Sequence, residues 1–230
     1  MKTIGVLGGL GPQATMDFEA RVHRVAQRLV PQRGNGGYPP LVVYYHRFPP
    51  FLKAEGWEPE LPLRAHPALL DAVAKIGGMA DFIVITSNFV HLFQTEIEQV
   101  SGCEVLSMVD TTLAEVQRRQ WRRVGVLGLG DPVVYTQPLG AMGLATETIV
   151  GDLRDRLDGA ILEVMEGREK ADSVSAARRG VDEVRGRSVD GIILGCTEIP
   201  LLLGDEATAP DLINPLELLA LAAVTRALQP

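Results

Sequence analysis

The sequence has few aromatic residues, only two cysteines and no long hydrophobic run. Aromatic residues make up 5% of the chain, whereas hydrophobic residues as a whole make up 46%. Cys103 and Cys196 are too few for a disulfide framework, so we expect a reducing compartment, the cytoplasm. No stretch reaches the roughly 18 consecutive apolar residues that a membrane span needs, and the N-terminus lacks the apolar core of a signal peptide.

Positive charge is also scarce. The 22 Lys and Arg residues are outnumbered by 29 Asp and Glu residues, and the net charge of -7 leaves no basic surface for nucleic acid or an anionic membrane. The charged fraction of 22% is ordinary for a globular chain. We therefore expect a compact protein whose partner is a small molecule, with neither nucleic acid nor a membrane among its partners.

Short apolar runs alternate along the chain with longer segments of helical periodicity. The predicted strands are residues 3–7, 41–45, 82–85, 105–108, 124–127 and 191–194. The predicted helices are residues 15–29, 63–76, 111–118, 153–165 and 173–184. Such alternation, with strands that are apolar throughout, is typical of parallel sheets buried on both faces. Residues 31–40 and 48–62 are predicted loops, and the second is long enough to be a mobile flap.

The two halves of the sequence resemble each other. Residues 4–12 (IGVLGGLGP) are similar to residues 124–132 (VGVLGLGDP), and residues 80–88 are similar to residues 189–197. The second match aligns Ser87 with Cys196. We expect an α/β fold of two similar lobes, each a parallel sheet flanked by helices, related by pseudo-twofold symmetry. Ser87 and Cys196 would lie on opposite walls of one cleft. The first lobe would comprise residues 1–114 and 210–230, and the second residues 115–209.

Cys196 stands where parallel sheets bind their ligands. It follows a predicted buried strand, and the N-terminus of a following helix would favour its thiolate form. The alternative is an inert, packed cysteine. No second Cys or His lies at metal-ligand spacing, so we expect no metal. Cys103 precedes a predicted strand, and we interpret it as structural.

Two further motifs favour other functions. Gly9-x-Gly11-x-x-Ala14 has the spacing of a dinucleotide fingerprint, but Pro12 removes an N–H from the turn and no acidic residue ends the second strand. The alternatives are a tight strand-to-helix turn and a turn whose amides face a small anion. Ser87 and His91 suggest a hydrolytic pair, yet the Gly-x-Ser-x-Gly motif is absent.

Taken together, these motifs resemble the aspartate/glutamate racemase family, the cofactor-independent amino-acid racemases. The resemblance covers essentially the whole chain. It rests on residues 1–12, on residues 86–91 (TSNFVH) and above all on residues 195–200 (GCTEIP). Residues 129–135 correspond more loosely to a Thr-rich loop that ends in Tyr.

The resemblance implies a racemase of aspartate, glutamate or a related amino acid that needs no cofactor and forms a homodimer in many members. Cys196 would be the main acid/base group and Ser87 its partner. Leu10, Asn88, Phe89 and Thr197 would bind the substrate, and Lys170 would bind its side-chain end.

The sequence also departs from the family pattern. Ser87 stands where most members have a first cysteine, and Phe89 replaces a Thr. The family segment Pro-Asp-Arg, whose Arg commonly binds the substrate's side-chain carboxylate, reads FPPF at residues 48–51, which leaves Arg47 as the neighbouring cation. One subgroup of the family, active on L-aspartate and L-glutamate, has Thr at the position that Ser87 occupies here. A loop of that subgroup resembles residues 53–57.

A serine hydroxyl is a poorer base than a thiol, whose unperturbed pKa is about 8.5. We therefore expect an asymmetric racemase that exchanges the Cα proton of one enantiomer faster than it inverts that enantiomer. Three other functions stay open. One is a single-thiol lyase or isomerase of the arylmalonate decarboxylase type, the second is a catalytically weak amino-acid-binding protein, and the third is a serine hydrolase that uses Ser87.

Overall fold

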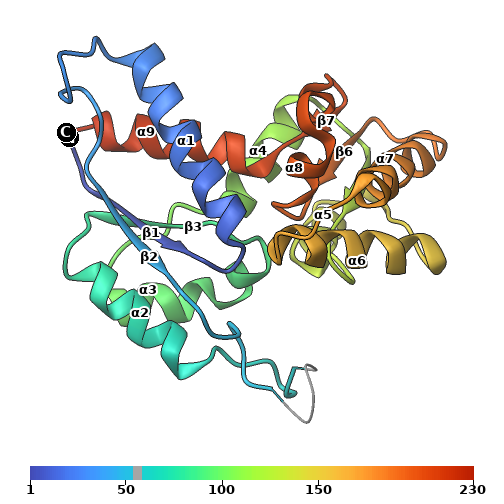
Figure 1. Ribbon diagram of the computed structural model, residues 1–230, viewed down its shortest axis with the longest axis horizontal. Coiled ribbons are helices and arrows are strands. Elements are labelled where there is room, and N and C mark those ends of the chain that lie inside the picture. Colours follow the sequence, from blue (N-terminus) through green and yellow to red (C-terminus); the bar gives the residue numbers. More distant parts are fainter. Residues whose placement is uncertain (54–58) are drawn as a thin grey trace. The chain divides into compact units, whose positions relative to one another are not determined.

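The computed structural model describes residues 1–53 and 59–230. Its contacts divide the chain into two compact units, unit 1 (Met1–Met108 with Leu219–Pro230) and unit 2 (Val109–Leu218). Each unit contains one parallel sheet flanked by helices, as the sequence predicts (Figure 1). The sequence predicts a first lobe of residues 1–114 with 210–230 and a second lobe of residues 115–209. These two boundaries remain predictions.

Unit 1 is built on three parallel strands in the order β2-β1-β3. These strands are β1 (Ile4–Gly8), β2 (Leu41–Tyr45) and β3 (Phe82–Ile85). The connecting helices are α1 (Pro12–Leu29), α2 (Pro67–Gly77), the short 3-10 helix η1 (Phe89–Phe93) and α3 (Gln94–Ser101). Figure 1 shows α2 and α3 on one side of the sheet and α1 on the other, so both faces are covered.

The strand predicted at residues 105–108 is wrong. Val105 forms only a single parallel bridge to Ile83, and α4 (Met108–Arg118) begins where that strand was expected to end. The backbone N–H of Met108 donates to Nε2 of His91 at 3.0 Å. The N–H of Met108 is therefore bonded to a side chain and not to a neighbouring strand. An apolar run in the sequence does not reveal such a bond.

Unit 2 has four parallel strands in the order β5-β4-β6-β7. They are β4 (Arg123–Leu127), β5 (Ala145–Glu147), β6 (Gly191–Leu194) and β7 (Leu212–Ile213). Its helices, besides most of α4, are α5 (Val133–Ala141), α6 (Asp152–Met165), α7 (Ala171–Arg185), α8 (Ile199–Leu203), the 3-10 helix η2 (Gly204–Thr208) and the start of α9 (Pro215–Leu228). Strands β5 and β7 were not predicted, because such short segments show no periodicity.

The two sheets share one strand order, and this order matches the sequence repeat. In each sheet the first strand, β1 or β4, is central and is flanked by the next two strands. The Val105 bridge beside β3 corresponds to the pairing of β7 with β6. Ser87 and Cys196 are each the second residue after β3 and β6, so they occupy equivalent positions at the carboxyl ends of equivalent strands.

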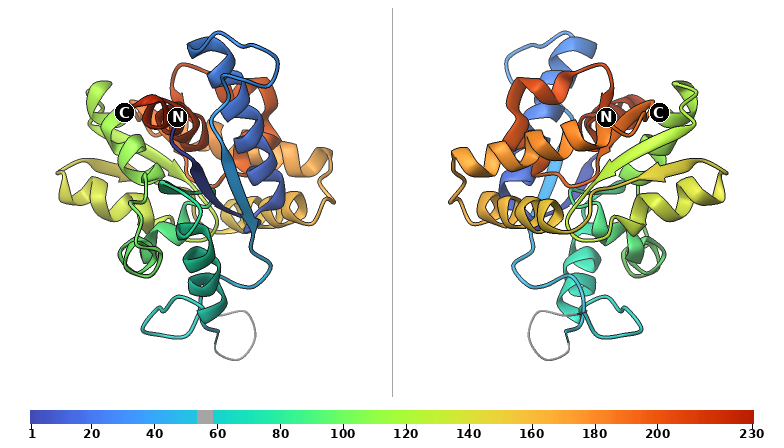
Figure 2. Two further views of the ribbon diagram at one scale, coloured as in Figure 1. Left: turned by 90° about the vertical axis from the view of Figure 1, so that its left-hand side faces the viewer. Right: turned by 90° about the vertical axis from the view of Figure 1, so that its right-hand side faces the viewer.

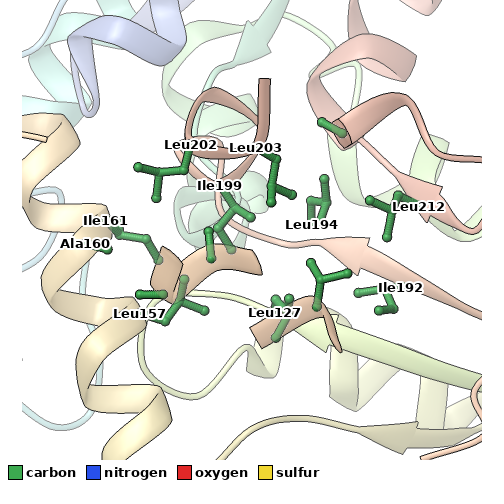
Figure 3. Packing of buried hydrophobic residues seen from close by; sticks show 14 of the residues in the cluster. Leu127, Leu157, Ala160, Ile161, Ile192, Leu194, Ile199, Leu202, Leu203 and Leu212 are labelled. Carbon is green, nitrogen blue, oxygen red and sulfur yellow. The ribbon is translucent and has the colours of Figure 1, made fainter. Parts of the chain in front are cut away.

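Burial on both faces explains why the strands are apolar throughout. In unit 2, alternate strand residues point into two different cores. Figure 3 shows the first core, in which strand residues pack against α6 and α8 through Leu127, Leu157, Ala160, Ile161, Ile192, Leu194, Ile199, Leu202, Leu203 and Leu212. The second core contains Trp121, Val124, Val126, Tyr135, Leu139 and Ile193.

The C-terminus returns to unit 1. The backbone N–H of Lys2 donates to the carbonyl of Ala227 at 2.8 Å, and the Lys2 amine donates to the carbonyl of Pro230 at 3.0 Å. Figure 2 shows the two chain ends side by side. In the part of the chain that the structure describes, no helix combines the length and apolar character needed to cross a membrane.

Candidate active site

The glycine-rich turn after β1 is closed by bonds within unit 1. Gly9 has φ +79°, and a side chain on it would meet the backbone of His46 at 2.7 Å. The N–H of Gly9 donates to Oγ1 of Thr15 at 2.9 Å, and that hydroxyl lies 2.9 Å from the hydroxyl of Thr86. Pro12 is the first residue of α1. The turn is thus a tight strand-to-helix connection, and the Gly9 amide that a phosphate would need is bonded to Thr15.

The same hydroxyl pair joins this turn to the segment that carries Ser87. Ser87 is partly exposed, Asn88 is buried and Phe89 keeps 37% of its surface exposed. Leu10, in the first turn, packs against the hydrophobic cluster that contains Val90. The predicted residues of unit 1 therefore lie on two neighbouring turns at the carboxyl edge of its sheet.

The two ring nitrogens of His91 form hydrogen bonds with backbone groups and not with the hydroxyl of Ser87. Its Nε2 accepts the N–H of Met108 at 3.0 Å, so in the neutral ring the proton sits on Nδ1. Nδ1 donates to the carbonyl of Ser87 at 2.9 Å. A serine hydrolase requires its histidine to accept the hydroxyl proton of the serine. This arrangement, in which both ring nitrogens hold main-chain groups, does not fit that role.

In unit 2, Cys196 is paired with a carboxylate. Its Sγ donates to Oε2 of Glu198 at 3.0 Å, and the hydroxyl of Thr197 donates to the same oxygen at 3.0 Å. Cys196 is partly exposed, whereas Thr197 and Glu198 are buried. Two hydrogen bonds thus converge on one oxygen of a buried acid, directly beside the thiol.

The prediction that the N-terminus of the following helix favours the thiolate form of Cys196 is wrong. Burial, together with the charge and the hydrogen bond of Glu198, raises the pKa of the Cys196 thiol well above its ordinary value. Burial also raises the pKa of Glu198, although the hydrogen bonds from Cys196 and Thr197 oppose that rise. The helix that follows, α8, is too short and too close to Glu198 to reverse the effect. The resting sulfur is therefore a thiol with an adjacent proton acceptor.

Gly195 sets the position of Cys196. Its N–H donates to the carbonyl of Leu127, and a Cβ on Gly195 would lie 2.9 Å from that oxygen and 3.2 Å from the ring of Tyr135. Tyr135 is fully buried. The turn that presents the thiol is thus packed directly against β4 and α5.

The two predicted cations, Lys170 and Arg47, each have a neighbour within their own unit. Lys170 precedes α7 with its amine 4.0 Å from Oε1 of Glu163, and its side chain is 69% exposed. The Arg47 guanidinium lies 5.1 Å from the centre of the Tyr45 ring. In the structure, neither is bonded to a predicted site residue of its own unit.

Sequence reasoning gave no role to two buried titratable residues. Glu198 could have been recognised as an acid two residues after Cys196, the predicted acid/base group. His46 follows β2, is 2% exposed, and its Nε2 has no hydrogen-bond partner in the described residues. Burial lowers the pKa of His46, so the ring stays neutral at pH 7. Its isolated position in the sequence gave no signal.

The remaining predictions concern Cys103, metals and the flap. Cys103 packs against the core of unit 1, and its sulfur contacts the carbonyls of Gly77 and Ala80, so its structural role is confirmed. Among residues 1–53 and 59–230, no group of three His, Cys, Asp or Glu side chains could hold a metal ion. The loop resemblance at residues 53–57 lies, apart from Lys53, outside the described residues.

Two units, each with a parallel sheet and with Ser87 and Cys196 after corresponding strands, define a class of two-unit α/β proteins. Residues 7–223 match the model of the Asp/Glu/hydantoin racemase family. The broad specificity amino-acid racemase RacX of Bacillus subtilis is 24% identical over 204 residues, which is 87% of each chain.

Two solved structures show the same fold. An Asp/Glu racemase structure from Yersinia pestis superposes with a TM-score of 0.76 at 22% identity over 100% of both chains. The Picrophilus torridus aspartate racemase has a TM-score of 0.73 at 21% identity over 99% of this chain and 94% of that one. The chain belongs to the Asp/Glu/hydantoin racemase family, as the sequence motifs predict.

Proposed function

We propose that this protein is a cofactor-independent amino-acid racemase that removes and returns the Cα proton of its substrate. The observation that carries the proposal is the Cys196–Glu198 pair, with its Sγ–Oε2 distance of 3.0 Å, at the carboxyl end of β6. Ser87 occupies the equivalent position after β3. Membership of the racemase family and the similarity to RacX, a broad specificity amino-acid racemase, support the same reaction.

The chemistry begins at the thiol. Glu198 accepts the thiol proton of Cys196, and the resulting thiolate removes the proton from one face of Cα. Asn88, Thr197 and the amides of the turn at Leu10 are the groups we assign to the carboxylate of the resulting anion. The hydroxyl of Ser87 then donates its proton to the opposite face and regains one from water, while Glu198 returns to the solvent the proton that it took from Cys196. Lys170 remains our candidate for the side-chain end.

The unequal basicity of the two groups predicts unequal rates. Cys196 takes and returns a proton on its own face many times, whereas donation by Ser87 is slow. One enantiomer of the substrate should therefore exchange its Cα proton with heavy water faster than it inverts. Proton NMR of both enantiomers of aspartate and glutamate, and of neutral amino acids, in heavy water measures both rates. Absence of exchange in every amino acid would refute the racemase.

Substitution of the two groups separates their roles. We expect Cys196→Ala to abolish exchange, and Ser87→Cys to raise the ratio of inversion to exchange by about tenfold or more, because a thiol donates and accepts the proton more readily. Cys103→Ser is the matched control, since its sulfur lies in packing, and it should keep exchange within about twofold of the wild type. Full activity of Cys196→Ala would contradict the assigned role.

A single-thiol enzyme of the arylmalonate decarboxylase type is the second candidate, favoured by the hydroxyl at position 87 in place of a second thiol. It would release carbon dioxide from a disubstituted malonate and leave amino acids unchanged. A catalytically weak binding protein would be stabilised against heat by an amino acid without any exchange. The cytoplasmic location and the homodimer stay predictions of the sequence.

A further inference from the structure

Three aromatic rings gather next to Ser87 in unit 1. The ring of Phe89 lies edge-on to that of Phe51, with centroids 5.5 Å apart, and edge-on to that of Phe93, with centroids 6.1 Å apart. Such perpendicular pairs are a favoured geometry and hold each ring in place. In a protein with only six Phe residues, three of them are concentrated at this point.

Phe51 is itself held by backbone pairing. It forms an antiparallel bridge with Ala65, and the N–H of the next residue, Leu52, donates to the carbonyl of Arg64 at 3.0 Å. Phe93 is buried at the end of η1. The ring of Phe89 is thus fixed by two anchored neighbours, and its exposed surface is a preformed apolar wall.

This wall lies within reach of a substrate at Ser87. Phe89 is the second residue after Ser87, so their Cα atoms are at most about 7 Å apart. Phe89 keeps 37% of its surface exposed, whereas the intervening Asn88 is buried. The side chain of an amino acid whose Cα lies at the Ser87 hydroxyl is therefore close enough to reach this ring.

Arg47, the cation that the sequence offers in place of the missing carboxylate-binding Arg, already has a neighbour in unit 1. Its guanidinium lies 5.1 Å from the centre of the Tyr45 ring. A carboxylate pressed against aromatic carbon loses hydration without gaining a partner, whereas an aliphatic or aromatic side chain gains from the contact.

We propose that Phe89, braced by Phe51 and Phe93, selects amino acids with uncharged, apolar side chains over aspartate and glutamate. This inference rests on the proposed racemase function and names its substrate class. One methylene in an apolar pocket changes kcat/KM by about 10- to 200-fold, so a whole ring contact is enough to set the preference.

The test compares kcat/KM for Cα-proton exchange in heavy water between methionine or leucine and aspartate or glutamate. In the wild type we expect the apolar amino acids to lead by about tenfold or more. Phe89→Thr should lower that lead by about tenfold, mainly through a higher KM for the apolar substrates. Phe89→Leu, which keeps an apolar surface, should retain most of it.

Leu92→Thr is the matched control, because Leu92 lies on the same helix η1 and is 38% exposed. It should leave the preference within about twofold of the wild type. Each variant is first shown to be folded by its thermal unfolding profile, and the wild-type preference is decisive even if Phe89→Thr does not fold. Faster exchange of aspartate or glutamate by the wild type, or an unchanged preference in folded Phe89→Thr, would overturn the inference while leaving the racemase standing. Absence of exchange in every amino acid would overturn both.

Discussion

At the scale of single residues, the Cys196–Glu198 pair decides how the thiol behaves. A cysteine at a strand end beside a helix is expected to ionise easily, yet here the neighbouring acid and burial keep the proton on sulfur. The cost of a buried carboxylate is offset by the hydrogen bonds from Cys196 and Thr197. The sulfur is thus protonated at rest and has a proton acceptor, Oε2 of Glu198, at 3.0 Å.

Removal of the Glu198 charge should lower the pKa of Cys196. In Glu198→Gln, the thiolate no longer faces a negative group, so we expect iodoacetamide to alkylate Cys196 at pH 7 at least about tenfold faster, equivalent to one pKa unit. The pH of half-maximal alkylation should fall accordingly. Mass spectrometry of the Cys196 peptide separates this reaction from that of Cys103. Glu206→Gln, at an exposed carboxylate of unit 2, is the control and should change little; slower alkylation of Glu198→Gln would contradict the pairing.

At the scale of elements, the turns after β6 and β1 are each held by close packing at the carboxyl end of a strand. The turn before Cys196 is seated against β4 and α5 by Gly195, where no side chain fits. The turn after β1 is held by Thr15 and Thr86, whose hydroxyls meet at 2.9 Å. Both turns are packed into the ends of buried strands, so their backbones have little freedom.

Gly195→Ala should therefore displace the Cys196 turn. A Cβ at 2.9 Å from the Leu127 carbonyl forces a shift that we expect to destabilise the protein by about 1–3 kcal/mol and to slow exchange by more than tenfold. Gly159→Ala in α6 is the matched control: a Cβ there meets open space, and we expect a gain of about 0.5–1 kcal/mol with unchanged activity. Denaturant unfolding and heavy-water exchange check both. Wild-type exchange by Gly195→Ala would show that the turn tolerates movement.

At the scale of the whole chain, each unit is a parallel sheet closed on both faces, and unit 1 is completed by the chain's last helix. Leu219, Ala220, Ala223, Val224 and Ala227 of α9 are almost fully buried. Arg226 pairs with Glu104 at 2.9 Å, and Lys2 bonds to Ala227 and Pro230. A segment at the end of the sequence thus contributes to the core of the unit that begins the sequence.

Truncation after Leu218 should unfold unit 1. Burial of Leu219 and Val224 alone is worth about 1.5–3 kcal/mol each, which is a large part of the 5–15 kcal/mol that stabilises a typical domain. We expect loss of the cooperative thermal transition of unit 1 and aggregation. Removal of Gln229 and Pro230 alone, which are exposed, should change the free energy of unfolding by less than about 1 kcal/mol. A truncated chain with wild-type unfolding would contradict this assignment.

Most of the fold could be predicted from the sequence, but the contacts of the site could not. Strands β2, β3 and β6 were predicted with their observed bounds and all five predicted helices within about four residues, because long apolar and amphipathic patterns report burial directly. The strand at residues 105–108 was wrong because His91, distant in sequence, takes the Met108 N–H. Strands β5 and β7 were not predicted, because a strand of two or three residues shows no hydrophobic periodicity.

By itself, the sequence determined that the chain is an α/β protein with a repeated strand order, and that Ser87 and Cys196 follow equivalent strands. These features depend on local periodicity and on the order of residues along the chain. Only the tertiary structure decided that Cys196 is a thiol bonded to Glu198, that His91 holds backbone and not the Ser87 hydroxyl, and that Phe51 and Phe93 brace Phe89. Ionisation and selectivity depend on distances between atoms and on burial, which composition and spacing do not contain.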